Sequence, residues 1–146
     1  MKSLSLETFV FFEKYRESIS NRDLERAAGF LKTPMPIFHP DGLKLVLDQN
    51  GVFQYLGALF RGMNAVGVRK MFHSIDDISK HTDGTRVSSL LTLNYMDSRE
   101  QHLRESRLRF FLDRDDHGLK IVMMDYKKAA FQQVLEDTPS VEPVGS

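Results

Sequence analysis

The stretch MPIFHPDG, residues 35–42, ends a short apolar run with a side chain that can carry chemistry. His39 is followed directly by Pro40, Asp41 and Gly42, a sequence typical of a turn. Imidazole has an ordinary pKa of about 6.5, so it can take or give a proton near neutral pH. Two interpretations stay open for His39: proton transfer to a ligand, or a structural hydrogen bond to Asp41 or to a neighbouring carbonyl.

Further side chains with possible binding roles share a strand face with apolar residues. His73 alternates with Met71 and Ile75, which predicts that it points toward the apolar face of its strand. Arg104 shares a face with Leu108, which makes it a candidate for binding an anionic ligand group at the mouth of a cavity. Three tyrosines at the edges of apolar patterns could each be core or pocket hydroxyl: Tyr55, Tyr95 and Tyr126.

The composition excludes several classes of function. The chain has no cysteine, which rules out thiol catalysis and thiolate metal sites, and its histidines lack the spacing typical of a metal site. Motifs of hydrolases, kinases, P-loop proteins and dinucleotide binders are also absent from the sequence, so we expect no metal and no cofactor. The 20 basic and 20 acidic residues give zero net charge, which argues against nucleic acid as a partner.

The apolar stretch near the N-terminus is short and contains Glu7 and Glu13, which is atypical of a signal peptide or a membrane span. We therefore expect a cytoplasmic protein without a membrane partner. A chain of 146 residues fits one compact domain, which we place at residues 1–135. The polar, proline-containing residues 136–146 are expected to form a flexible tail.

Apolar residues at helical spacing predict three helices. The first covers residues 6–19, and the second opens at SNRD, residues 20–23, which has the form of a capping box and precedes an apolar stripe that ends before Pro34. Asp48 is expected to cap the third helix, residues 49–66.

From residue 68 the apolar period changes to about 2, which predicts strands joined by hairpins. The expected order is α-α-β-β-α-β-β-β-β. We predict an α+β fold in which three helices pack on a strongly curved, mostly antiparallel sheet, a half-open cone with a cavity between helix and sheet. The expected strands are Met35–His39, Leu43–Leu47, Val68–Ser79, Arg86–Met96, Glu100–Leu112 and Leu119–Lys128.

This element order, together with NRDLERAAGFL at residues 21–31 followed by a strand and a Pro-Asp-Gly turn, resembles the nuclear transport factor 2-like superfamily. Its fold is called the cone-shaped, or cystatin-like, α+β barrel. Members include SnoaL-like polyketide cyclases, ketosteroid isomerases, scytalone dehydratases and limonene epoxide hydrolases. The resemblance covers residues 5–131. It implies the fold more strongly than an activity, because this fold hosts enzymes, transport factors and association domains.

The ketosteroid isomerases offer a pattern for two residues of this chain. In that family a tyrosine on the first helix donates a hydrogen bond to the substrate oxyanion, and an aspartate before a proline shuttles the proton. Tyr15 and His39, twenty-four residues apart with Pro40 following, match these two positions. The residue type at His39 differs, and no carboxylate stands near Leu108–Arg109, where the family has a second acid.

The resemblance therefore implies a SnoaL-like pocket protein for a small apolar or carbonyl-containing ligand. Its expected activity is cofactor-independent acid–base catalysis, such as isomerisation, dehydration or cyclisation, with His39 as proton shuttle and Tyr15 as hydrogen-bond donor. The alternative is a non-catalytic module for binding a ligand or another protein. The resemblance also implies a homodimer through the outer sheet face. The expected apolar walls are Phe12, Phe38, Phe60 and Tyr95.

Overall fold

Three helices and six strands follow one another in the predicted order in the computed structural model, which describes residues 4–80 and 86–131. The expected tail at residues 136–146 lies outside the described residues. The helices are α1 (Leu4–Ser20), α2 (Leu24–Ala28) and α3 (Gln49–Ala65). The strands are β1 (Met35–His39), β2 (Gly42–Val46), β3 (Lys70–Lys80), β4 (Arg86–Met96), β5 (His102–Asp115) and β6 (Gly118–Lys128).

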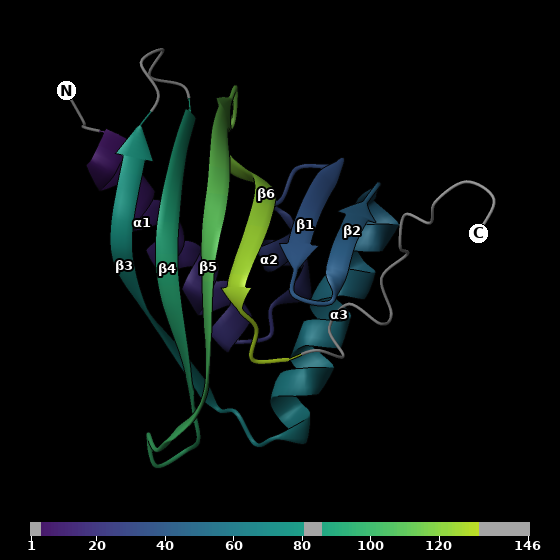
Figure 1. Cartoon of the computed structure of the whole chain (residues 1–146), viewed down its shortest axis with the longest axis vertical. Coiled ribbons are helices and arrows are strands. Elements are labelled where there is room, and N and C mark those ends of the chain that lie inside the picture. The colour runs from purple at the N-terminus through teal and green to yellow at the C-terminus, as the bar shows by residue number, and fades with distance from the viewer. Residues whose placement is uncertain (1–3, 81–85, 132–146) are drawn as a thin grey trace.

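The six strands form one curved sheet in the order β2-β1-β6-β5-β4-β3 (Figure 1). Four of the strand pairings are antiparallel, whereas β1 and β6 run parallel, with Ile37 opposite Met124. The sheet is open, with β2 and β3 at its edges. The prediction of an α+β fold with a mostly antiparallel sheet is therefore confirmed. We call the sheet face that α1 covers the inner face and the opposite one the outer face.

The hydrophobic core lies between α1, α3 and the inner face. Phe12 and Ile19 of α1 are each 1% exposed, because residues at helical spacing share one side of the helix. The Phe12 ring lies 5.2 Å from that of Phe110 on β5, which fixes the helix against the middle of the sheet. Every second residue of β4 from Leu91 to Tyr95 is buried, as expected for a strand with one covered face.

The helix caps were only partly predicted. Asp48 caps α3 as expected, and its carboxylate accepts a hydrogen bond from the Gly51 N–H at 2.9 Å. The capping box at residues 20–23 is wrong, because Ser20 ends α1 and its hydroxyl accepts the Met71 N–H instead. Asp23 caps α2 by accepting from the Arg26 N–H at 3.2 Å, and α2 already ends at Ala28.

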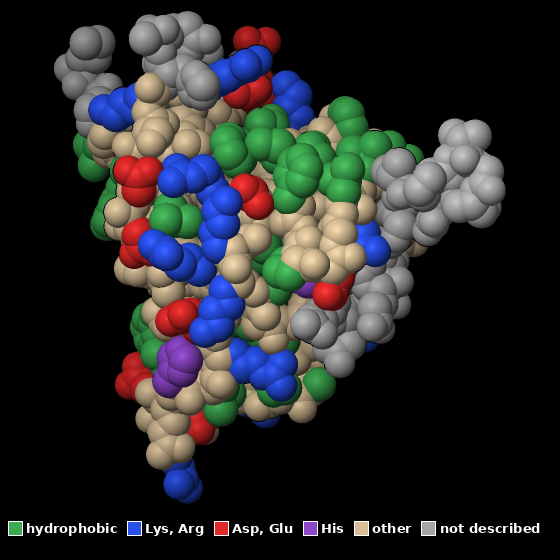
Figure 2. Space-filling model, viewed as in Figure 1, with side chains coloured by type: hydrophobic (Ala, Val, Ile, Leu, Met, Phe, Trp, Pro, Cys, Tyr) green, Lys and Arg blue, Asp and Glu red, His purple; other side chains and the backbone are tan. Residues whose placement is uncertain are grey.

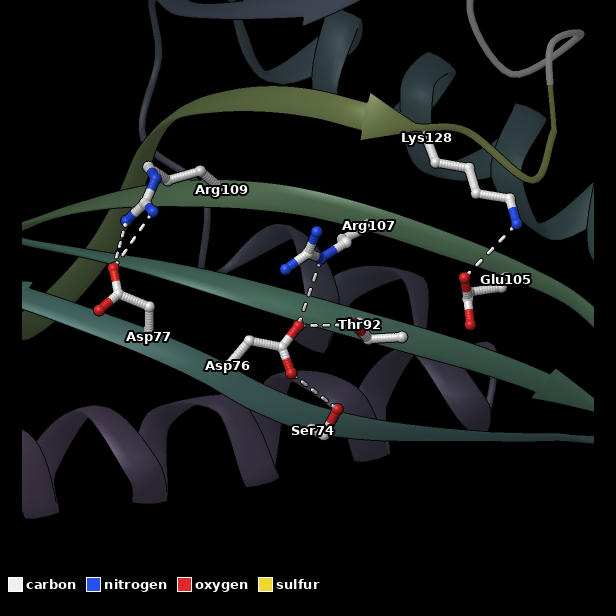
Figure 3. Close-up of polar contacts among 8 residues, drawn as sticks. All are labelled: Ser74, Asp76, Asp77, Thr92, Glu105, Arg107, Arg109 and Lys128. Atoms are coloured by element: carbon white, nitrogen blue, oxygen red, sulfur yellow. Dashed lines mark hydrogen bonds and ion pairs between the residues drawn. The ribbon is translucent and has the colours of Figure 1, made fainter.

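A network of ion pairs covers the outer face of β3, β4 and β5 (Figure 3). A bulge in β3 turns both Asp76 and Asp77 to this face. Arg109 on β5 reaches over β4 to Asp77 at 3.2 Å, and Arg107 lies 3.5 Å from Asp76. The two arginines therefore face away from the core, on the opposite side of β5 from the buried Leu108. Each exposed pair contributes little to stability, on the order of 0.2–1 kcal/mol.

No helix in the described ranges, residues 4–80 and 86–131, is long and apolar enough to cross a membrane.

Candidate functional site

His39 lies at the end of β1 with its ring in the protein interior. Met35, Ile37 and His39 alternate along the strand and are all buried, while the intervening Phe38 is exposed. Parallel pairing with β6 sets this alternation, because it places Ile37 beside the buried Met124. The His39 side chain is 1% exposed. The chain thus turns a titratable group inward at the point where the strand stops pairing.

A local hydrogen bond fixes which ring nitrogen of His39 carries a proton. The Asp41 backbone N–H donates to Nδ1 at 3.1 Å, so Nδ1 of the neutral ring is an acceptor. The single proton of the neutral imidazole is therefore on Nε2. Nε2 is buried and has no hydrogen-bond partner among the described residues. In this tautomer the interior nitrogen of His39 can donate a hydrogen bond but cannot accept a proton.

The environment of His39 favours the neutral ring. Burial lowers the pKa of His39, and the Asp41 carboxylate, whose oxygen lies 3.6 Å from Nδ1, opposes that shift. The net direction is downward, so the uncharged Nε2–H form predominates at neutral pH.

The four tyrosines of the chain come together in the interior from four different elements. Tyr15 belongs to α1, Tyr55 to α3, Tyr95 to β4 and Tyr126 to β6. The hydroxyls of Tyr55 and Tyr126 lie 2.7 Å apart and share a hydrogen bond, and the Tyr55 hydroxyl also donates to the Met124 sulfur at 3.4 Å. We call these four side chains the tyrosine cluster.

Burial keeps the phenols of the tyrosine cluster protonated. It raises the pKa of Tyr126 to about 12 and raises the pKa values of Tyr15, Tyr55 and Tyr95 as well. Charge repulsion adds to the shift: an ionised Tyr126 would raise the pKa of each of the other three. At neutral pH the cluster is a set of uncharged donors.

Tyr126 connects His39 to the tyrosine cluster. Their ring centroids lie 5.2 Å apart, since the two residues follow paired positions on the adjacent strands β1 and β6. Tyr15 interacts electrostatically with Tyr126 but makes no hydrogen bond to His39 within the described part of the chain. Both residues suggested by the family pattern therefore interact with Tyr126, His39 through its ring and Tyr15 electrostatically.

Three of the four predicted apolar walls, Phe12, Phe60 and Tyr95, are buried, and the fourth is not. Phe12 and Phe60 belong to the core, at 1% and 8% exposure. The expectation that Phe38 lines the interior is wrong: its side chain is 43% exposed and lies opposite Leu43 on the outer face. The sequence MPIFH is apolar up to its histidine, so both faces of the strand looked equally suited to the core.

Arg104 lies on the predicted face and borders a hollow of about 330 Å³ that contains no tyrosine. It pairs across the sheet with Tyr95, yet it is exposed, and its guanidinium donates to the Ala130 carbonyl at 2.9 Å. The guanidinium also lies 5.6 Å from the centroid of the Phe131 ring, and that ring packs on Tyr95. The segment that follows β6 thus lies between Arg104 and the interior, which places Arg104 outside the tyrosine cluster.

His73 lies apart from the tyrosine cluster, between β3 and α1. Its Nε2 is 3.7 Å from the Glu13 carboxylate, and its Nδ1 is buried with no partner among the described residues. Burial lowers the pKa of His73, whereas Glu13 raises it. His73 borders a hollow of about 760 Å³ between α1 and β3 that contains no tyrosine.

Sequence reasoning missed two contributors to the site. Ser106 on β5 hydrogen-bonds Tyr95, which lowers the Tyr95 pKa against the larger effect of burial, and its hydroxyl accepts the Ala130 N–H at 2.9 Å. Met124 supplies the sulfur that accepts from Tyr55. Ser106 interrupts an otherwise apolar strand face beside Leu108, which is the signal that could have identified it.

Four hollows lined by described residues are bordered by none of the cluster's tyrosines and not by His39. The described residues also hold no group of three or more metal-binding side chains. Tyr15, Tyr55 and Tyr95 are only 1–5% exposed, so ligand access to them would require side chains to move.

The two buried histidines should make stability depend on pH. Both pKa values are lowered on folding, so the unfolded chain binds more protons below the ordinary pKa of about 6.5. The free energy of unfolding should be fully maintained above that pH and should fall as the pH drops toward the folded-state values. Urea titrations between about pH 7.5 and 5 measure this slope.

Substitution separates the two histidines from the remaining titratable groups in that experiment. The slope should flatten in the His39→Gln and His73→Gln variants, whereas His117→Gln, at an exposed turn, should leave it unchanged. An equal slope in all four proteins would contradict a shifted pKa at either buried ring.

The fold defines a class: an NTF2-like α+β protein whose helices cover an open, curved sheet. The family described as NTF2-like protein (DUF6841) matches residues 7–128. The chain belongs to this family, which confirms the resemblance to the nuclear transport factor 2-like superfamily.

Solved structures support the same fold. Aln2 from a Streptomyces species is 15% identical over 86% of this chain and 90% of that chain, with a TM-score of 0.68. An NTF-2 like protein from Shewanella oneidensis is 8% identical over 84% and 97%, with a TM-score of 0.67. ActVI-ORFA from Streptomyces coelicolor is 16% identical over 86% and 96%, with a TM-score of 0.65. No curated protein sequence matches the chain.

Proposed function

We propose that the interior of this protein binds a small carbonyl compound through hydrogen bonds from His39 and the tyrosine cluster. The observation that carries the proposal is the buried Nε2–H of His39, which lacks a partner among the described residues and lies beside Tyr126. A buried donor without a partner costs about 1–3 kcal/mol, so a ligand oxygen that accepts its hydrogen bond would recover that free energy.

The donors of this site suit a ligand oxygen that gains negative charge. His39 is neutral and the phenols are protonated at neutral pH, so each can donate without first losing a charge of its own. Uncharged donors fixed in an apolar interior stabilise a developing oxyanion more than the starting carbonyl. Isomerisation, dehydration and cyclisation next to a carbonyl pass through such an oxyanion.

The local hydrogen bond changes the role that we propose for His39. A proton shuttle needs a free lone pair, but Nδ1 accepts from Asp41 and Nε2 carries the proton. We therefore propose His39 as a neutral hydrogen-bond donor to the carbonyl oxygen. Tyr15 acts as an additional donor. Catalysis would then rest on polarisation of the carbonyl by these donors, with a solvent water molecule as the base that takes the proton from the adjacent carbon.

Titration with 1-tetralone, an aromatic ketone, tests the proposal, with tetralin as the matched ligand that lacks the oxygen. Tetralone should bind more tightly than tetralin, and His39→Leu should weaken tetralone binding about three- to tenfold, as for one net hydrogen bond. His39→Gln, which keeps an N–H donor, should restore part of the affinity. Phe38→Leu, an exposed neighbour, is the control and should change nothing.

The same titration in D₂O distinguishes an enzyme from a binding module. Accelerated exchange of the protons next to the tetralone carbonyl, lost in His39→Leu, would support catalysis through a stabilised oxyanion. Binding without exchange would support a non-catalytic ligand-binding module. Equal affinity for tetralone and tetralin would contradict the proposed role of the donors.

An exposed apolar area supports a second proposal, association of two copies through the outer face. Phe38 and Leu43 pair across β1 and β2 and are 43% and 46% exposed. Beside them lies a hollow of about 290 Å³ that includes Phe111 and Met123. Figure 2 shows hydrophobic side chains gathered on this part of the face, next to a column of charged ones. Exposed apolar surface of this kind marks interaction sites.

The Phe38→Glu variant tests that association. A dimer through this area should dissociate, because the new carboxylate of each copy would be buried without a partner. Phe72→Glu, at a 40% exposed position on β3, is the control. Light scattering that shows a monomer in all three proteins would contradict the proposed dimer.

A further inference from the structure

A pocket separate from the tyrosine cluster lies between α1, α2 and the start of β6. Its volume is about 540 Å³, within the range of small-molecule sites. Figure 1 shows the beginning of α1 and the β5–β6 hairpin at the same end of the molecule. Phe11 and Phe30 border the pocket and both contact Tyr15, so their rings separate it from the cluster. We call it the α1–α2 pocket.

One side of the α1–α2 pocket is apolar. Phe11 and Leu119 are buried beneath it, and the Phe11 and Phe30 rings meet edge to face at 5.4 Å. Leu6 and Val10 of α1 border it with 50% and 41% of their surface exposed. A ligand with an apolar body would remove this surface from water, which is favourable in proportion to the area covered.

The other side of the α1–α2 pocket is cationic. Lys14 makes no ion pair among the described residues, and Lys120 donates to the Gly29 carbonyl at 2.6 Å, which leaves its positive charge uncompensated there. One guanidinium nitrogen of Arg26 pairs with the Glu17 carboxylate at 3.3 Å, and its other guanidinium nitrogens remain available to a ligand. Three Lys and Arg side chains therefore border the pocket.

The nearby carboxylates are already engaged. Glu7 is the single acidic residue among those that border the pocket, and Arg114 binds both of its carboxylate oxygens. Asp115 accepts the His117 N–H at 2.8 Å. Asp113, the cross-strand neighbour of Lys120, pairs with Arg86 at 3.2 Å. The balance of charge in the pocket is therefore positive.

We propose that the α1–α2 pocket binds a small amphipathic anion, a carboxylate carried on an alkyl or aryl body. The carboxylate would contact the ammonium groups of Lys14 and Lys120, and the body would lie on Val10, Phe11 and Phe30. Both halves of such a ligand match the two sides of the pocket. This site is independent of the ketone site that we propose above.

Calorimetric titration with octanoate tests the proposal, with 1-octanol as the uncharged ligand of equal length. Octanoate should bind more tightly than octanol, and its binding should weaken in higher salt because the contacts are ionic. Lys14→Gln should weaken octanoate binding about fivefold, and Lys14→Gln with Lys120→Gln about twentyfold or more. Lys70→Gln, an exposed cation on β3, is the matched control and should retain full affinity.

Two features keep the test decisive. Lys120→Gln removes the hydrogen bond to the Gly29 carbonyl and could affect folding, whereas the exposed Lys14 makes no such bond to the residues that the structure describes. Lys14→Gln alone therefore still tests the proposal. His39→Leu should not change octanoate binding, which separates this site from the interior one. Equal affinity for octanol and octanoate, no octanoate binding, or an equal loss in Lys70→Gln would each overturn the proposal.

Discussion

Phe12→Ala is expected to lower the free energy of unfolding by about 3–5 kcal/mol. The Phe12 side chain is 1% exposed and its ring contacts those of Phe11 and Phe110, each at 5.2 Å. Truncation to alanine removes the contacts that join α1 to the middle of the sheet and leaves a cavity that the surrounding rings can fill only in part. Urea unfolding of the two proteins measures the difference.

Phe9→Ala on the same helix is the matched control. Phe9 is 52% exposed, so its truncation should change the free energy of unfolding by less than about 0.5 kcal/mol, as for most surface substitutions. Comparable losses in the two variants would show that α1 does not present the Phe12 side to the sheet. The fold described above would then be wrong in its central packing contact.

Tyr55→Phe should destabilise the protein by about 1–3 kcal/mol and should cost more than Tyr126→Phe. The reason is the order of donation in the hydroxyl pair. The Tyr55 hydroxyl donates its proton to the Met124 sulfur at 3.4 Å, so we infer that Tyr126 is the donor between the two hydroxyls, which lie 2.7 Å apart. Removal of the Tyr55 oxygen leaves the Tyr126 hydroxyl without its acceptor, whereas removal of the Tyr126 oxygen still leaves Tyr55 its donation to sulfur.

A double-mutant cycle of Tyr55→Phe and Tyr126→Phe measures this coupling. The double variant should cost less than the sum of the two single variants, because no orphaned hydroxyl remains. Strictly additive losses would contradict the hydrogen bond between the two phenols, and a larger loss for Tyr126→Phe would contradict the order of donation.

Local periodicity was sufficient to predict the order of the helices and strands. Apolar residues alternate in β4 from Leu91 to Tyr95 and form a stripe along α1, because these are the residues that folding buries. Both patterns can be read directly from the sequence. The bounds of β4, Arg86–Met96, agree with the prediction at both ends.

Features that depend on distant parts of the chain could not be predicted. Phe38 faces outward because β1 pairs with β6, more than eighty residues later in the chain. Arg104 is separated from the interior because Ala130 and Phe131 fold back against it. Three of the tyrosines lie at the edges of apolar patterns in the sequence, but only tertiary packing brings their hydroxyls together with that of Tyr15.

The protonation of His39 depends on local geometry that the sequence only partly indicated. Asp41 was expected as a partner, and it is one, but the main contact comes from its backbone N–H at 3.1 Å. A carboxylate partner alone would have favoured a proton on Nδ1 and a lone pair facing the interior. The backbone donor instead places the proton on Nε2, which changes the chemistry open to the residue.

The most direct test of the interior site is nitrogen NMR of the His39 ring as a function of pH, in the wild type and in Tyr126→Phe. We predict the Nε2–H tautomer at neutral pH, a titration midpoint below the ordinary value of about 6.5, and a shift of that midpoint when the Tyr126 hydroxyl is removed. A neutral ring protonated on Nδ1 would contradict His39 as an interior donor beside the tyrosine cluster. So would a titration midpoint at the ordinary value that is the same in the wild type and in Tyr126→Phe.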